Sequence, residues 1–576
     1  MRAFSHLIFV VIMLCHAYVM AFAQAAPKEA PETGTIAGRV TTRDDEPLPH
    51  VGLALMPVQP NDQRKAVARA TTGADGFYRM ANVPAGSYRL QLLAPAYTSA
   101  SSSPRGGWNE SKIINLTAGE TIEGQDFTLA RGGVITGRVA DADGKPLIAE
   151  YLKVTRANHD PRSGHDYVIQ PYAFETDDRG VYRIYGLPAG RYHVSVGEDK
   201  EHGAVGIAIS GKNFTRTFHP NATEQAQAKI IEVSSGSEAT NIDITLAAPV
   251  KTYEATGRMI DAETGKPAPG VLYGIGVVSP DGRQITGQGW DNSKTDALGE
   301  FRLRNLLPGR YAVTARAERE DTANYYSAPV PFEITDGNVE GLVVKVQRGG
   351  ILSGVAVLEN TKDRAALVKF SQLMLHVDVR PAEPQSGELR AWNSWRARLQ
   401  PDGSFRVMGL PPGKAQLSLE PYSAATGFTL LRLEHGGVEQ SDGVKVGVGE
   451  HLSGVRVVMA YGTSIMRGQV DMRRDGAPAQ IPDGGQLRVS VRRRGAGRSR
   501  WGDYGAEVDA RGRFMLEGLA AGEYELTMQG WIRPTPAAPQ GMPLPAVIQI
   551  VNVPEKGETS VTVVYDLNAK PEGTTP

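Results

Sequence analysis

Residues 159–166 are the first group whose side chains could do chemistry. His159, Asp160, His165 and Asp166 offer imidazole and carboxylate groups, which are common ligands of divalent metals. They lie in a polar, turn-rich stretch, so their spacing fixes no coordination geometry. A solvated loop is the favoured interpretation, and the sequence predicts no metal site.

Two aspartate-rich turns could hold calcium through their carboxylate oxygens. They are Asp141-Ala142-Asp143-Gly144 and Asp177-Asp178-Arg179-Gly180. Neither belongs to a twelve-residue calcium loop. Tight hairpin turns select aspartate and glycine for conformational reasons alone, so the sequence favours plain turns.

Known catalytic motifs are missing from the chain. None of the eleven histidines is followed by glutamate at the third position, which excludes the zinc motifs H-x-x-E and H-E-x-x-H. The sequence also lacks a G-x-S-x-G elbow, a G-x-x-x-x-G-K-[ST] phosphate loop and a complete dinucleotide fingerprint. It therefore predicts a non-enzymatic protein without catalytic residues or cofactors.

Four tryptophans are candidates for binding sugars. Trp290, Trp392, Trp395 and Trp501 have polar or glycine neighbours, and exposed aromatic faces stack on sugar rings. Packing inside a β-sandwich is the favoured alternative. Trp392 and Trp395 are an odd number of residues apart, so on a strand their rings point to opposite faces and at most one belongs to the core.

A basic cluster could hold an acidic polysaccharide or another anionic surface. It comprises Arg488, Arg492, Arg493, Arg494, Arg498 and Arg500. Arg492, Arg494 and Arg498 are the binding candidates, and a solvated hairpin tip is the favoured alternative. The chain has no nucleic-acid-binding motif and begins with an export signal, so nucleic acid is not an expected partner.

That export signal occupies the first residues. Arg2 supplies a positive charge, Leu7 to Met20 is a nearly continuous apolar run, and Ala21-Phe22-Ala23 is a small-x-small cleavage site. Cleavage after Ala23 is expected, with Ala25 as an alternative, and a retained membrane anchor is the less favoured interpretation. The only cysteine, Cys15, lies inside this signal, so the mature chain is expected to have no disulfide and no membrane span.

Length and composition indicate several ordinary globular domains. The chain has 576 residues, of which 41% are hydrophobic and 22% charged, and its formal net charge is −1. One hydrophobic core does not grow to this size. A nearly neutral chain has no global field that would attract it to nucleic acid or anionic lipid.

An internal repeat organises the chain. Five copies place a second glycine ten residues after a turn glycine, with an aromatic residue two positions after the first glycine. Alternating apolar residues after a glycine turn indicate a strand with one buried face, so each copy is a strand–turn–strand unit. The copies are TTGADGFYRMANVPAGSYRLQL, TDDRGVYRIYGLPAGRYHVSV, TDALGEFRLRNLLPGRYAVTA, QPDGSFRVMGLPPGKAQLSL and DARGRFMLEGLAAGEYELTM.

Further strands surround each copy, and no stretch shows a sustained helical period. Short strands with frequent turns in units of this size predict all-β sandwiches with about seven strands each. The predicted organisation is a signal peptide (1–23), a linker (24–33), five sandwiches (34–132, 133–249, 250–349, 350–462 and 463–568) and a tail (569–576).

The pattern G-x-V, then D-x-x-G-x-[FY]-x-[IL], then L-P-x-G-x-Y-x-[LV] resembles carboxypeptidase regulatory-like domains. Residues 133–249 match it best, and residues 350–462 less well because Ala415 replaces the tyrosine. The resemblance implies a transthyretin-like (prealbumin-like) Greek-key sandwich, often grouped with carbohydrate-binding-like folds. It implies the accessory domain without its peptidase.

Short joints such as Ala130-Arg131-Gly132-Gly133 predict that the five sandwiches form a semi-rigid rod. The expected function is binding or adhesion in the periplasm, on the outer surface or outside a bacterial cell. Carbohydrate or cell-envelope polysaccharide is the expected ligand, largely because of the family resemblance. The alternatives are a structural spacer or accessory subunit that binds another envelope protein, and an enzyme of unknown type.

Overall fold

The computed structural model shows an all-β chain of five sandwich modules. In each, two sheets enclose one apolar core. This confirms the predicted fold class; the domain limits predicted above remain predictions. The structure describes residues 33–58, 65–99, 111–157, 174–197, 214–279, 281–289, 293–317, 323–359, 364–380, 389, 394–419, 427–481, 485–495, 504–532 and 542–568.

The repeated residues build the same corner in each module. The first glycine of every copy has a positive φ, between +71° and +81°, which turns the chain without the strain a Cβ would bring. In four copies the later tyrosine is buried, and its hydroxyl donates a hydrogen bond to the carbonyl oxygen four residues earlier. The repeat is therefore a folding signal.

Module 1 has the sheets β4–β1–β9–β6, with β8 also beside β1, and β3–β2–β5–β7. Its first strand pairs with β9 in parallel, a pairing of first and last long strands that recurs in every module. The strands are β1 (Thr33–Thr42), β2 (Gly52–Pro57), β3 (Ala68–Thr71), β4 (Phe77–Pro84), β5 (Gly86–Leu93), β6 (Tyr97–Ser99), β7 (Ser111–Leu116), β8 (Thr121–Ile122) and β9 (Phe127–Arg131).

Module 2 repeats this plan with shorter strands. Its sheets are β12–β10–β16, with β17 beside β10, and β11–β13–β14, with β15 beside β13. The elements are β10 (Gly133–Asp141), β11 (Lys153–Arg156), β12 (Val181–Leu187), β13 (Gly190–Val196), β14 (Thr217–Phe218), the short 3-10 helix η3 (Gln225–Gln227), β15 (Ile231–Val233), β16 (Glu238–Ala239) and β17 (Ile244–Leu246).

Module 3 has the sheets β21–β18–β25–β23 and β20–β19–β22–β24. All seven residues of β19 are buried, so this strand is covered on both faces. The strands are β18 (Tyr253–Asp261), β19 (Leu272–Val278), β20 (Ile285–Gly289), β21 (Glu300–Leu306), β22 (Gly309–Arg316), β23 (Tyr325–Tyr326), β24 (Val330–Ile334) and β25 (Val339–Arg348).

Module 4 contains the one described α-helix. Its sheets are β29–β26–β34–β31–β32 and β28–β27–β30–β33. The elements are β26 (Gly350–Glu359), α2 (Arg364–Phe370), β27 (Met374–Arg380), β28 (Ser394–Arg398), β29 (Ser404–Leu410), β30 (Gly413–Leu419), β31 (Phe428–His435), β32 (Val438–Glu439), β33 (Val444–Val446) and β34 (His451–Tyr461).

Module 5 has the longest strands. Its sheets are β36–β35–β39, with β42 beside β35, and β38–β37–β40–β41. The strands are β35 (Ser464–Arg474), β36 (Ala477–Pro478), β37 (Gly485–Arg493), β38 (Tyr504–Glu507), β39 (Arg513–Leu519), β40 (Gly522–Ile532), β41 (Met542–Val553) and β42 (Glu558–Asp566).

Three of the four joints between modules are built on glycine. A Cβ on Gly132 would lie 2.4 Å from Gly186 Cα, and one on Gly349 would lie 2.4 Å from Gly409 Cα. A Cβ on Gly462 would come within 2.1 Å of the backbone that follows β39. Real Cβ atoms do not approach backbone so closely, so each joint packs directly on the end of a strand of the next module, namely β12, β29 or β39.

The joint between modules 3 and 4 also has a side-chain brace. Asn324 Nδ2 donates to the carbonyl oxygen of Gly349 at 2.7 Å, and Asn324 Oδ1 accepts from the backbone N–H of Gly409 at 2.7 Å. One amide next to β23 thus ties the joint residue Gly349 to Gly409 on β29 of module 4.

The joint between modules 2 and 3 is different. Residues 247–252 separate β17 from β18 without forming a strand, and Ala247, Ala248, Pro249 and Lys251 are exposed. No glycine in this segment packs on a neighbouring turn, because the segment contains none.

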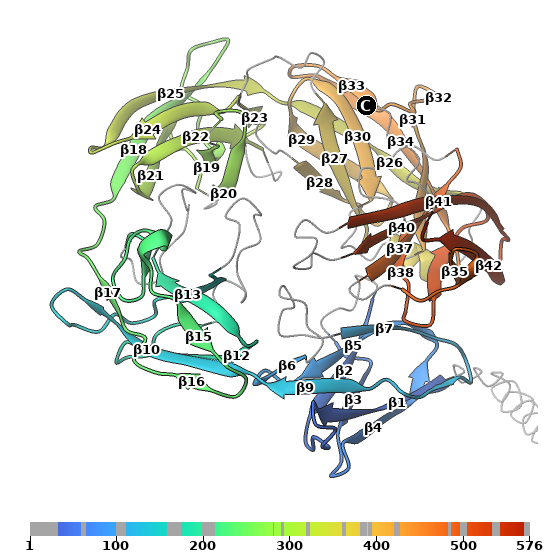
Figure 1. The fold of residues 1–576 in the computed structure, drawn as a ribbon. Helices are drawn as coiled ribbons and strands as arrows, with labels where there is room; N and C mark the ends of the chain where they lie inside the picture. The colour runs from blue at the N-terminus through green and yellow to red at the C-terminus, as the bar shows by residue number, and fades with distance from the viewer. Residues whose placement is uncertain are drawn as a thin grey trace, which may run out of the picture.

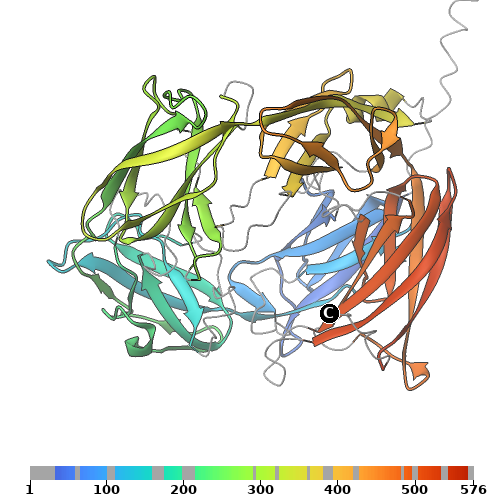
Figure 2. The same ribbon diagram turned by 90° about the horizontal axis from the view of Figure 1, so that it is seen from above.

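The modules curve into a closed ring, so the expectation of a semi-rigid rod is wrong. Module 5 lies beside module 1 in both views (Figures 1 and 2), and hydrogen bonds join residues about 400 positions apart, such as Asn115 and Arg513. The short joints were recognised correctly, but their shortness says nothing about the angle between modules. Successive bends bring the two end modules together.

Candidate functional site

Many of the predicted site residues lie outside the described residues. These are Trp290, Trp392, Trp501, Arg498, the cleavage site Ala23, and the group His159, Asp160, His165 and Asp166. Their proposed roles stay predictions. Within the described ranges, no three histidine, cysteine, aspartate or glutamate side chains gather as a metal site would require.

Trp395 belongs to the core of module 4. The residue is only 5% exposed and packs with the apolar cluster of that module, so its ring offers no face to a sugar. Its indole nitrogen has no hydrogen-bond partner among the described residues. For Trp395 the packing interpretation is therefore right, and the prediction that it binds a ligand is wrong.

Arg492 and Arg494 are occupied by partners in their own module. Arg492 Nη2 lies 2.6 Å from Glu525 Oε1, and Arg494 Nη1 lies 2.6 Å from Glu523 Oε1. These are cross-strand pairs between β37 and β40, which follow from the register of the hairpin. The paired carboxylates cancel much of the positive field that an acidic polysaccharide would need.

The aspartate-rich turns use their carboxylates to hold themselves. Asp141 Oδ1 accepts from the backbone N–H groups of Asp143 and Lys145, and Asp177 Oδ1 accepts from those of Arg179 and Val181. The expectation of plain turns agrees with these bonds.

A serine, a histidine and an aspartate gather on one sheet of module 4. His376 Nε2 lies 3.4 Å from Asp378 Oδ2, and Ser418 pairs with His376 across β27 and β30. Within the described part of the chain no hydrogen bond joins the hydroxyl of Ser418 to the imidazole, which a nucleophilic serine requires. Ser418, His376 and Asp378 are thus the residue types of a catalytic triad, but no described hydrogen bond would carry a proton from the serine to the histidine.

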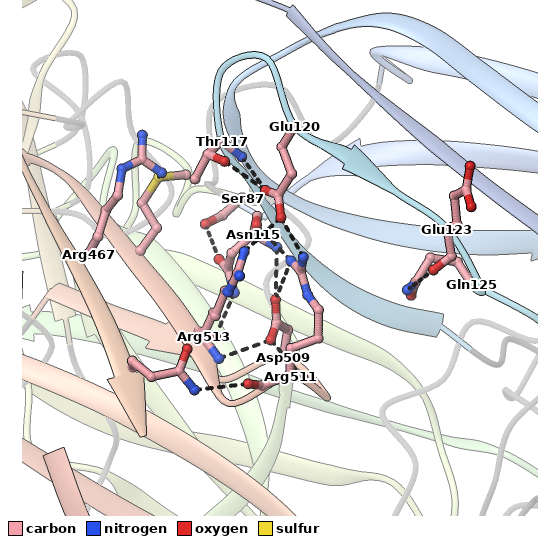
Figure 3. Close-up of polar contacts among 12 residues, drawn as sticks. Ser87, Asn115, Thr117, Glu120, Glu123, Gln125, Arg467, Asp509, Arg511 and Arg513 are labelled. Carbon is pink, nitrogen blue, oxygen red and sulfur yellow. Dashed lines mark hydrogen bonds and ion pairs between the residues drawn. The ribbon is translucent and has the colours of Figure 1, made fainter. Parts of the chain in front are cut away.

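Among the described residues, an extensive polar contact joins the two end modules. Arg511 Nη1 lies 2.8 Å and Arg513 Nη1 2.6 Å from the same oxygen, Glu120 Oε1. The two arginines flank the turn glycine Gly512 of module 5, and Glu120 lies in the turn between β7 and β8 of module 1 (Figure 3). One carboxylate oxygen thus receives two guanidinium groups from the other end of the chain.

Backbone groups extend this contact. Asn115, on the edge strand β7, donates through Nδ2 to the carbonyl oxygen of Arg513 at 2.8 Å, and its carbonyl oxygen accepts from Arg511 Nη2 at 2.9 Å. Its backbone N–H also reaches Asp509 Oδ2 at 3.3 Å. Asn115 and Asp509 are 4% and 3% exposed, so their polar atoms are satisfied by protein groups of both modules instead of water.

A second ion pair lies beside the first. Arg89 Nη2, on β5, is 2.7 Å from Glu507 Oε1, on β38. Burial, and to a lesser extent the charge of Glu517 on β39, raise the pKa of Tyr88 on β5 to about 12. Burial raises the pKa of Glu517 itself, and Arg467 offsets only part of that rise.

Glu120 is held as a carboxylate. Burial alone would raise its pKa, but the backbone N–H and hydroxyl of Thr117, at 2.9 and 2.8 Å from Oε2, together with Arg511, lower the pKa to about 2. The group is therefore charged at neutral pH, which the two arginines require. We call Glu120, Asn115, Asp509, Arg511 and Arg513 the end contact.

Sequence reasoning missed the end contact entirely. Arg511 and Arg513 lie inside the fifth copy of the repeat, and their only unusual feature is that two arginines flank one turn glycine. It also missed Trp531, which is 44% exposed on β40 with Gln486 directly opposite on β37. The signal in the sequence was the position of Trp531 in the alternating pattern of β40, which places its side chain on the exposed face of the strand.

Comparison with solved structures finds many low-identity matches. The Streptococcal ancillary pilin is 13% identical, covering 55% of this chain and 98% of its own, with a TM-score of 0.23. The Bacillus anthracis TIE protein is 12% identical, covering 76% and 75%, with a TM-score of 0.16. The shaft pilin SpaA from Lactobacillus rhamnosus GG is 12% identical, covering 37% and 97%, with a TM-score of 0.18. Scores this low support no argument about function.

No protein with a curated description matches the chain. No helix among the described residues is long and apolar enough to span a membrane. Residues 35–130 match the family model of the carboxypeptidase regulatory-like domain, so the resemblance read from the repeat is confirmed for module 1.

Proposed function

We propose that the chain is an exported, non-enzymatic scaffold whose five modules hold binding surfaces for another cell-envelope protein in a closed ring. The observation that carries this proposal is the end contact, which fixes both ends of the chain and so sets the position of every loop between them. A flexible string of binding modules would need no such contact. The apolar N-terminal segment with its small-residue site supports export.

Cross-linking tests this role. The full-length tagged chain, expressed in its own cell type, is cross-linked and its partners are identified from the envelope fraction. We expect one envelope protein to be enriched with the wild-type chain and with Arg179→Glu, and to be lost with Glu120→Arg, which disturbs the ring. Substrate turnover in an unbiased hydrolase screen, or equal enrichment with all three chains, would count against a ring scaffold.

Polysaccharide binding is a second candidate, and Trp531 favours it. Its exposed ring lies beside the exposed side chain of Gln486, so an aromatic face and an amide are available together, as sugar recognition needs. Retention on cell-envelope polysaccharide columns should fall with Trp531→Ala and persist with Trp395→Phe, whose residue is buried. Unchanged retention with Trp531→Ala would exclude this face.

A further inference from the structure

Two kinds of connection hold the ring together. Three joints pack glycine against backbone, and so leave no room for one module to rotate on the next. The other two connections are the exposed segment 247–252 and the polar end contact. These two are the places where the ring can bend and where it can open.

We propose that the chain is a clasp with two arms, modules 1–2 and modules 3–5, which turn about residues 247–252 and are held closed by Glu120 against Arg511 and Arg513. Hinges are typically short segments that absorb backbone rotation while packed bodies move rigidly. The three glycine joints all lie within the arms, and the unpacked joint is the only one between them. The positions of the connections therefore match the requirements of a hinge and a latch.

The latch is polar, which makes it reversible. Its charged and titratable groups are Glu120, Arg89 and the neutral phenol of Tyr88 on module 1, and Glu507, Asp509, Arg511, Arg513, Glu517 and Arg467 on module 5. Arginine–carboxylate pairs that are partly exposed regain hydration when they separate, so opening costs less than parting two apolar cores. Closure is favoured because both halves belong to one chain, which gives them a high effective concentration.

Acid acts on the latch in a defined direction. Glu120 has a lowered pKa, so its contribution is present above its ordinary pKa of 4.5 and is lost as the pH falls toward about 2. Glu517 has a raised pKa and acts oppositely, because its charged form is penalised by burial. Glu507 pairs with Arg89 across the latch, whereas Asp509 pairs with Arg511 of its own module.

Small-angle X-ray scattering of the full chain tests the latch, with light scattering to establish the mass. Glu120→Arg should raise the radius of gyration and the maximum dimension at unchanged monomeric mass, because it places three cations together. Arg179→Glu changes the corresponding exposed turn in module 2 and should leave the curve unaltered. Superimposable curves for Glu120→Arg and wild type would overturn the proposal.

A variant in module 5 controls for local misfolding caused by the change at Glu120 in module 1. Arg513→Glu should open the ring as Glu120→Arg does, and the double variant should close it again in part, because a pair of opposite sign is restored. Closure within one chain also requires the wild type to be a monomer. A wild-type dimer, or an open double variant like either single one, would contradict the assignment.

Spin labels locate the hinge. In a Cys15→Ser background, Asp178→Cys with Asp336→Cys spans residues 247–252, whereas Asp336→Cys with Glu439→Cys spans the glycine joint at Gly349. When Arg513→Glu opens the ring, the first pair should show a broader distance distribution and the second should not. Equal broadening in both pairs would place the bending elsewhere.

Discussion

The turns that begin at Asp177 in module 2 and at Asp509 in module 5 have the same construction. In each, Oδ1 accepts from the backbone N–H groups of the second and fourth residues that follow. In each, Oδ2 pairs with an arginine two residues on, Arg179 at 2.7 Å and Arg511 at 2.9 Å. The repeat therefore builds one turn twice.

Their surroundings differ. The side chains of Asp177 and Arg179 are 37% and 75% exposed, whereas those of Asp509 and Arg511 are 2% and 30% exposed against module 1. Turn geometry is thus a property of the module, and its use as a contact is a property of the neighbour. A folding element becomes a docking element by gaining a complementary surface.

The largest difference is expected from removing the two aspartates. Asp509→Ala leaves Asn115 and the arginines without their buried acceptor, so the free energy of unfolding should fall by about 3 kcal/mol. Asp177→Ala removes only solvent-accessible turn bonds and should shift calorimetric unfolding much less. Equal shifts would mean that docking adds nothing to the turn.

The facing residue on module 1 should have the next largest effect. Asn115→Ala removes the amide that donates to Arg513 and accepts from Ser87, at a cost of about 2 kcal/mol. Glu232 is the corresponding residue of module 2, opposite Arg191 as Asn115 is opposite Ser87. Glu232→Ala should leave the unfolding midpoint in urea nearly unchanged, and a comparable loss would refute the role assigned to the end contact.

The stability that each turn contributes should also depend differently on pH. Glu120 stabilises the docked turn above pH 4.5, and because its pKa is lowered to about 2, this stabilisation disappears as the pH falls between those values. The difference in melting temperature between wild type and Glu120→Gln should therefore shrink over this range. The pKa of Asp177 is also lowered, chiefly by its hydrogen bond with Arg179, but that pair does not face module 1. A difference that stays constant with pH would exclude the ionic contribution.

The smallest contrast is expected inside the modules. Tyr192→Phe and Tyr524→Phe each remove a hydroxyl that donates to a carbonyl oxygen of its own module. The bond within each module should contribute about 1 kcal/mol. The hydroxyl of Tyr524 also bonds to Thr429 of module 4, so Tyr524→Phe should cost slightly more than Tyr192→Phe. Hydrogen exchange of β13 and β40 measures the two losses separately, and a smaller loss for Tyr524→Phe would contradict this expectation.

The fold was predictable because its signals are local. Turn glycines such as Gly180 and alternation such as Tyr192, Val194 and Val196 specify strands and buried faces within a few residues. The same rules place Trp395 in the core, since its neighbours on β28 alternate around it.

The site was not predictable because it depends on angles between modules. Nothing near Glu120 in the sequence indicates that Arg511 will meet it, and a run of basic residues such as Arg492 and Arg494 gives no sign that acidic residues lie opposite on β40. Such contacts come from the path of the whole chain, which periodicity does not encode.

The glycine joints have a consequence for how the gene can change. Because Gly132, Gly349 and Gly462 seat one module on the next at a fixed angle in three of the four joints, those angles limit where the last module can lie relative to the first. Duplicating or deleting one repeat would carry Arg511 and Arg513 away from Glu120. The closing contact thus depends on the number of modules. We therefore expect gain or loss of a module to be tolerated far less than in open repeat arrays.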